Sequence, residues 1–449
     1  MRHSTLVLAS FTAALSGCSG CSEPQTTGAP SAVAIVSAVP LASNDVIKNK
    51  TRTTDPTIAL GNLDSQIAQT TGLLASHPKN PDLYGKTVSL LLQRSGVTGS
   101  AKDRARALEI AEAYLADHPE EEKAHSIHAH ALAAMHRFDE ALAEVDVSEK
   151  LTKVPGSNAE LRFDILAALG RYDEVYGPEK QLAEKYPSPS TLLTYATTAG
   201  HMGKTEEAEA AFVKAEELFH GATPFLLATI YYERASLWER LGDLPKATLL
   251  YRAAIERLPQ HAHAAVHLAA LLSPSEGVAL LEPLTRGDDV DPDALGELSV
   301  LQSLVKEKSG EEMLARARAR YDLLMTEQPT AYADHAGWFW LVAGGDPKKA
   351  EAAAKKNLEV RKTAEAYELS IAAEQAISDK DALCAVAADA RALQYRSPKL
   401  DEALRTIKDC PAVAPGASAS AAASVSASPS SAASVSAAAS APSSTPAKP

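Results

Sequence analysis

Apolar positions along most of the chain recur with the period of an α-helix, and the apolar stretches come in pairs that a short polar turn separates. Residues 231–259 show the arrangement clearly, as YYERASLWERLGDLPKATLLYRAAIERLP, with the turn at Gly242. In the second stretch, small and aromatic residues return at spacings of four and three, at Ala247, Tyr251 and Ala254. Each stretch therefore has one apolar face, and the pair predicts a helical hairpin.

The hairpin repeats along the chain. With Ala247 as the anchor of the second helix, equivalent positions follow one another at steps of 33 to 39 residues, at Ala107, Ala141, Val175, Ala208, Ala247, Leu281, Ala315, Ala350 and Cys384. Most anchors are small, because two helices that cross at close range leave no room for a large side chain. The longest step contains an insertion around Gly221 to Pro224.

A small residue on the first helix, a small-aromatic-small pattern on the second and a closing Pro259 resemble the tetratricopeptide repeat (TPR). The resemblance covers roughly residues 55–410. It implies an all-α fold, a TPR-like right-handed superhelical solenoid of about nine hairpins over residues 56–410. The resemblance weakens around Leu281 and in the units from Ala315 to Cys384, where irregular hairpins, a kink near Ser273 or another Ala-rich helical packing are the alternatives.

The N-terminus has the features of a signal peptide. A short positive region precedes an apolar run from Thr5 to Leu15, which is too short to cross a membrane as a stable helix. The sequence Leu-Ser-Gly-Cys that ends at Cys18 resembles the lipobox of bacterial lipoproteins. The resemblance implies cleavage of residues 1–17 and lipidation of Cys18, and Ser19 then favours the outer membrane. The alternative is ordinary secretion with a free Cys18.

Both ends of the repeat region have the composition of disordered segments. Residues 18–55 are rich in Ser, Thr, Pro, Ala and Gly, which predicts a flexible tether with a reach of roughly 30 to 35 Å. Residues 411–449 are almost wholly Ala, Ser, Val and Pro and cannot bury a core. We expect this tail to be disordered; a spacer or a glycan-bearing stalk is the alternative.

The charge and the motifs exclude several classes of function. A net charge of -13 argues against a nucleic-acid partner, because phosphate binding needs clustered Lys and Arg. The sequence lacks the nucleophile-elbow, P-loop and dinucleotide-binding motifs, so we expect no enzyme activity and no cofactor. Histidines at helical spacing suggest a metal site, but no Cys or carboxylate completes a recognised ligand set, so we expect no metal; they are His125, His128, His130, His263 and His267.

Two cysteines near the end of the repeat region form a candidate disulfide. Cys384 lies at the start of the second helix of the last predicted hairpin. Cys410 lies at the end of a closing helix that should run antiparallel to that helix. In an oxidising compartment the two could pair, and closing a loop of about 25 residues would stabilise the chain by roughly 3 to 4 kcal/mol. The alternative is a buried free thiol.

The resemblance implies a scaffold whose concave face, lined by the first helix of each hairpin, binds proteins or peptides. In the most regular units the residues expected on that face are Ser190, Leu193, Thr197, His201, Thr229, Tyr232, Ser236, Glu239 and Arg240. We expect a lipid-anchored protein of the bacterial envelope, facing the periplasm, that serves envelope assembly, secretion or wall maintenance. The alternatives are the helical part of a peptidoglycan-acting enzyme system and a periplasmic metal-binding protein.

Overall fold

The computed structural model describes residues 46–408, apart from 153, 155 and 307, together with Cys410. The chain divides into two units, residues 1–408 and 409–449. The expected signal peptide, the lipidation site Cys18 and the tail at 411–449 lie outside the described residues, so they stay predictions. Every regular element among the described residues is a helix, as the sequence pattern predicts.

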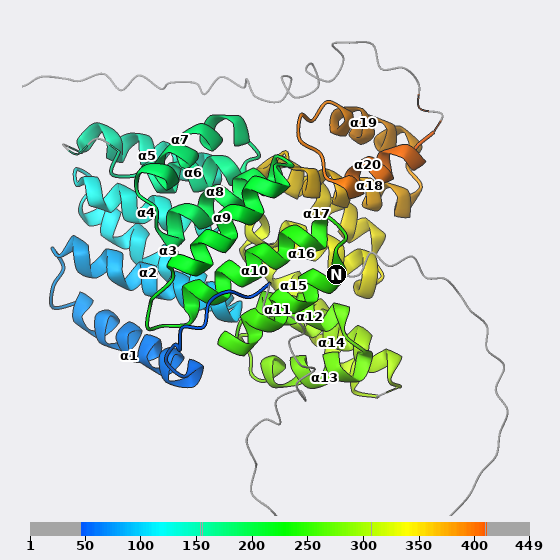
Figure 1. Ribbon diagram of the computed structural model, residues 1–449, viewed down its shortest axis with the longest axis horizontal. Coiled ribbons are helices and arrows are strands. Elements are labelled where there is room, and N and C mark those ends of the chain that lie inside the picture. Colours follow the sequence, from blue (N-terminus) through cyan, green and yellow to red (C-terminus); the bar gives the residue numbers. More distant parts are fainter. Residues whose placement is uncertain (1–45, 153, 155, 307, 409, 411–449) are drawn as a thin grey trace, which may run out of the picture. The chain divides into compact units, whose positions relative to one another are not determined.

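The described part of the first unit is an array of helical hairpins (Figure 1). Helix α1 (Pro56–Leu74) precedes nine hairpins, α20 (Pro398–Thr406) follows them, and η1 (Glu282–Thr285) and η2 (Trp340–Gly344) are single turns of 3₁₀- and π-helix. The hairpins are α2 (Pro81–Thr98) with α3 (Ala101–Asp117), α4 (Glu122–Ala134) with α5 (Phe138–Leu151), α6 (Ala159–Ala168) with α7 (Tyr172–Lys185), α8 (Pro189–His201) with α9 (Thr205–Leu218), α10 (Phe225–Arg240) with α11 (Leu244–Arg257), α12 (Ala262–Leu271) with α13 (Pro274–Leu281), α14 (Pro292–Leu304) with α15 (Ser309–Glu327), α16 (Pro329–Phe339) with α17 (Pro347–Val360), and α18 (Ala364–Ile377) with α19 (Lys380–Arg391).

A shared turn closes several hairpins. The backbone N–H of Lys204 donates to the carbonyl of Ala199, five residues earlier, and that of Asp243 donates to Trp238 in the same way, both at 2.9 Å. The preceding residues, Gly203 and Gly242, have positive φ, a conformation in which glycine escapes the steric cost of a Cβ. The turn satisfies carbonyls at the helix end and reverses the chain in three residues.

Small residues lie where the helices cross. Ala107, Ala141, Ala208, Ala247 and Ala350 are fully buried, as the anchor positions require. The crossing helices can therefore approach closely, and each hairpin nests against the next with a thin apolar seam.

The predicted anchors are wrong in two units. Ala315 is exposed. The small buried residue at the crossing in α15 is Ala317. Buried Tyr321 and Leu324 follow it at spacings of four and three, as Tyr251 and Ala254 follow Ala247. In the preceding unit, Leu281 is the last residue of α13, so it cannot be the residue at the crossing.

Gly277 is the residue at that crossing. It is the fourth residue of α13, as Ala247 is of α11, and a Cβ there would lie 3.0 Å from the carbonyl oxygen of Ala269. Because α12 has only ten residues, the crossing comes earlier than the 34-residue period predicts.

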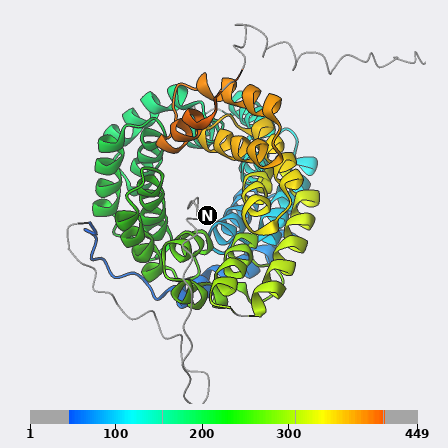
Figure 2. The same cartoon turned by 90° about the vertical axis from the view of Figure 1, so that its right-hand side faces the viewer.

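The hairpins coil so tightly that the later ones return to the early ones, and the first unit forms a ring when viewed along its axis (Figure 2). The hydroxyl of Thr330 donates to the carbonyl of Met135 at 2.7 Å, and Arg361 lies 3.0 Å from Nδ1 of His136. The ring of Tyr395 reaches Asp173, to which its hydroxyl donates. Contacts between residues about 200 positions apart therefore close the superhelix on itself.

Candidate functional site

A cavity of about 540 Å³ lies among the first helices of seven successive hairpins, α6 to α18. Its wall also includes residues of α7, α11, α17 and α20, so helices from most of the ring contribute to it. This volume is within the range of natural ligand sites. The inner face of the array thus holds a partly open cavity.

Five of the predicted groove residues line the cavity, namely His201, Tyr232, Ser236, Glu239 and Arg240. The other four lie elsewhere on the same two helices. Ser190 is exposed at the start of α8, and Leu193 packs against the core beside it. The hydroxyls of Thr197 and Thr229 donate to carbonyls one turn earlier in their own helices. That a ligand binds these residues stays a prediction.

Part of the cavity wall holds a partly buried charge cluster, in which the His335 side chain is 35% exposed and that of Asp293 is 8% exposed. Nδ1 of His335 bonds to the carboxylate of Asp293, which also accepts the hydroxyl of Tyr321. Burial alone would lower the pKa of His335, but the carboxylates of Asp334 and Asp293 raise that pKa to about 10. At neutral pH this histidine is therefore a cation. Asp334 in turn accepts a hydrogen bond of 3.0 Å from Arg361.

Two further ion pairs line the cavity, and one of them lies close to this cluster, because the ring centroid of His263 is 5.8 Å from that of His335 and 6.4 Å from that of Tyr232, which is 6.0 Å from that of His267. Glu239 accepts hydrogen bonds from the hydroxyl of Tyr251 at 2.6 Å and from Nδ1 of His267 at 2.8 Å. Burial would raise the pKa of Glu239, but His267 and the Tyr251 hydroxyl lower it to about 2. The Glu239 carboxylate is therefore an anion at neutral pH and contributes a fixed negative charge to the cavity wall.

Glu365 lies 3.4 Å from Nδ1 of His201 and 3.9 Å from Arg240. Burial would raise its pKa, but the charges of these two residues lower it. Its side chain is nevertheless 41% exposed, which shows that water can enter this part of the cavity. The His201 ring stacks on Tyr172 at 5.3 Å between centroids, which fixes one face of the imidazole.

Two polar atoms of the wall have no partner within the described residues. Asn357 is 2% exposed and lines the cavity, yet its side-chain oxygen accepts no hydrogen bond. One turn later, Nε of Arg361 is buried and donates none. A buried group without a partner costs about 1–3 kcal/mol, and because both atoms lie beneath the cavity surface, a ligand does not reach them unless the wall moves.

The histidines that suggested a metal site lie in two different environments. Nδ1 of His125 lies 2.5 Å from Glu144, and Nδ1 of His128 lies 3.2 Å from the same carboxylate on α5. His263 and His267 line the cavity, where His263 lies 3.9 Å from Asp291. Within the described ranges, these and the other His, Cys, Asp and Glu side chains form no group of three that could hold a metal ion.

Cys384 is buried near the start of α19, and Cys410 lies in the second unit. Each of them is disulfide-bonded. That the two are joined to each other stays a prediction.

Sequence reasoning missed the cavity residues of α14 to α18, among them Asp293, Asp334, His335, Asn357 and Glu365. The sequence pattern predicts groove residues only in the most regular units. The irregular units also have charged side chains on their first helices, α14, α16 and α18, and these side chains line the cavity. A charged residue on the first helix of an irregular unit therefore predicts a cavity-lining position as well as one in a regular unit does.

No protein-family model and no curated protein matches the sequence. Among solved structures, the APC/C hetero-tetramer Cut9-Hcn1 is 16% identical over 77% of this chain and 67% of that chain, with a TM-score of 0.41. A tetratricopeptide repeat protein from Parabacteroides merdae is 17% identical over 55% of this chain and 96% of that chain, with a TM-score of 0.33. At these TM-scores the similarities carry no argument, and the TPR-like fold is shown by the hairpins and their crossings. None of the described helices is both long and apolar enough to span a membrane.

Proposed function

We propose that this chain is a membrane-anchored scaffold that holds a segment of another protein in the cavity. The observation that carries the proposal is the cavity itself, whose wall holds charged side chains of both signs, among them Glu239, Glu365 and His335. A peptide segment brings main-chain donors and acceptors together with charged side chains that such a wall can pair. The wall therefore suits a polar peptide segment, and its charges select the sequence.

The size of the cavity favours a short segment as the ligand. Its volume of about 540 Å³ is within the range of about 300–1,000 Å³ found for ligand pockets, so the cavity suits a few residues of a loop or of a chain end.

The location of the scaffold belongs to the same proposal. The signal peptide at 1–17 would direct export and would then be removed. A lipid on Cys18 would hold the array at a bacterial membrane, and Ser19 favours the outer membrane. There it would serve envelope assembly, secretion or wall maintenance. Wall-hydrolase activity of the pure protein would instead favour the enzyme alternative, and stoichiometric zinc would favour the metal-binding one.

Photo-cross-linking tests the cavity as the binding site. A photoreactive amino acid at Ser236 faces the cavity, whereas one at Glu217, which is half exposed on α9, reports on another surface. We expect one protein to cross-link reproducibly from position 236 in intact cells and not from position 217. The variant Glu365→Gln keeps the side-chain volume and removes one charge of the cavity wall, so it should weaken the cross-link. Equal products from both positions would contradict the proposal.

A further inference from the structure

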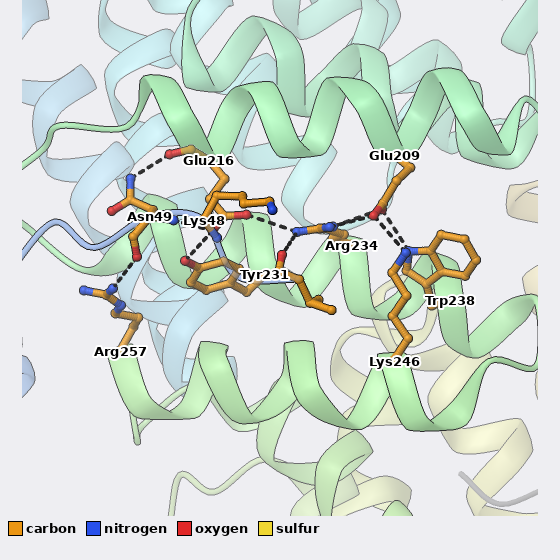
Figure 3. A network of polar contacts seen from close by, with 10 residues as sticks. Lys48, Asn49, Glu209, Glu216, Tyr231, Arg234, Trp238, Lys246 and Arg257 are labelled. Atoms are coloured by element: carbon orange, nitrogen blue, oxygen red, sulfur yellow. Dashed lines mark hydrogen bonds and ion pairs between the residues drawn. The ribbon is translucent and has the colours of Figure 1, made fainter. Parts of the chain in front are cut away.

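A second groove lies between α9 and α11, on a face of α10 different from the one that lines the cavity. The step between the anchors of these two helices is the longest in the array, 39 residues from Ala208 to Ala247. Tyr231, Arg234 and Trp238, at spacings of three and four on α10, point into the space between α9 and α11 (Figure 3). Lys48 and Asn49 lie beside Glu216 at this space (Figure 3), and residues 46–54, which have no regular secondary structure beyond a turn at 46, make hydrogen bonds to its walls.

Asn49 is the centre of the contact. It is 7% exposed, and its side-chain amide donates to the carbonyls of Glu216 at 2.6 Å and Phe219 at 2.8 Å, at the C-terminal end of α9. Its backbone N–H donates to the Glu216 carboxylate at 2.7 Å. The asparagine therefore helps to cap the C-terminal end of α9, where the Glu216 carbonyl also accepts from the Phe219 N–H at 3.2 Å.

Most other hydrogen bonds between the groove and the segment use the segment's main chain, while Val46 and Ile47 pack against the apolar cluster around Tyr231. Arg234 donates to the carbonyl of Val46 at 2.9 Å, and Arg257 donates to the carbonyl of Thr51 at 2.5 Å. The N–H of Thr54 donates to the carbonyl of Ala222, in the insertion that lengthens the step. These contacts place donors and acceptors along the segment's backbone, as in other modes of peptide recognition.

The floor of the groove is a buried ion pair. Arg234 is 2% exposed and lies 3.0 Å from Glu216, which is fully buried, and it also pairs with Glu209 at 2.6 Å. Tyr231 donates to the same Glu216 carboxylate at 3.0 Å. Charges of this kind are costly to bury unless hydrogen bonds satisfy them, and the segment supplies several of those bonds.

We propose that the α9–α11 groove is a peptide-binding site whose resident ligand is the chain's own residues 46–54. Docking there fixes the point at which the N-terminal segment leaves the array, beside α10 in the middle of the hairpins, although the first helix of the array is α1. The expected tether at 18–55 is thus held from residue 46 onward. This inference concerns a different surface from the cavity and does not depend on its partner.

Tryptic cleavage measures whether the segment is docked. Lys48, Lys50 and Arg52 are exposed side chains within it, so each bond after them becomes cleavable when the backbone leaves the groove. In the full chain, Asn49→Ala should speed cleavage at these three sites at least tenfold, while circular dichroism shows the helices intact. The control Thr53→Ala, which removes no contact with the groove, should cleave at the wild-type rate. Equal rates in the wild type and Asn49→Ala would overturn the proposal.

A labelled synthetic peptide of residues 44–56 tests the groove as a site in its own right. The Asn49→Ala chain should bind this peptide at least tenfold more tightly than the wild-type chain, whose groove is occupied. The same peptide with Asn49→Ala should bind the variant chain at least tenfold more weakly. Equal binding to both chains would show that the groove is not the site and would overturn the proposal. Neither measurement involves the lipid or the cavity, so a failure of the proposed function leaves both results unchanged.

Discussion

Replacing Gly277 with alanine should destabilise the array, although alanine is the better helix former. At an exposed helical position the change from glycine would stabilise by roughly 0.5–1 kcal/mol. At Gly277 the new Cβ would lie 2.7 Å from Cδ1 of Leu301 and 3.0 Å from the carbonyl oxygen of Ala269. The leucine can rotate but the carbonyl cannot, so α13 must move away from α12. Overpacking of this kind costs about 1–3 kcal/mol, so after the gain in helix propensity the net loss is about 0–2.5 kcal/mol.

Gly61 provides the matched control. It lies inside α1, is exposed, and a Cβ there meets nothing within 4 Å. Urea unfolding followed by circular dichroism should therefore show opposite signs, with Gly61→Ala slightly more stable than the wild type and Gly277→Ala less stable. Stabilisation by both substitutions would refute the claim that close helix crossings demand small residues in this unit.

Two further predictions concern charge and covalent structure. The pKa of His335 is raised from its ordinary value of 6.5 to about 10, so its charge stabilises the fold fully below pH 6.5 and progressively less as the pH rises toward 10. The loss of stability in His335→Gln should then be larger at pH 6 than at pH 10 in urea unfolding, and an equal loss would argue against the charge cluster. Peptide mapping without reduction should recover Cys384 joined to Cys410, and reduction should lower the unfolding temperature of the last helices; recovery of other pairs would refute that pairing.

The helices and turns of this fold could be predicted because the signals that set them are local. Small residues at a regular spacing mark the crossings, and Gly203 and Gly242 mark the turns. The predicted crossing residues were wrong in two units because the helix lengths there differ from those of the regular units. In α12–α13 the helices are short and the crossing residue is Gly277, and in α15 the helix is longer and the pattern begins at Ala317. A fixed period cannot follow changes in helix length.

The closure of the ring could not be predicted. It depends on small rotations that add up over several hairpins, and no local pattern shows that Thr330 will reach Met135. Because closure creates the cavity, its residues from α14 to α18 were missed together. The docking of residues 46–54 was missed for another reason: most of these residues are polar, as in a linker, and all their hydrogen bonds to the groove except those of the Asn49 and Thr51 side chains use the main chain. Val46 and Ile47 add apolar contacts.

The contact between Tyr395 and Asp173 allows the most direct test that the array closes on itself. The two side chains are bonded although 222 positions separate them, and the Tyr395 ring also lies against Tyr172, with centroids 6.1 Å apart. A benzophenone amino acid in place of Tyr395 should, on irradiation of the folded protein, form an intramolecular cross-link to residues 170–174, identified by mass spectrometry of tryptic peptides. Cross-links confined to residues 380–406 would show that the superhelix is open and that the cavity does not form.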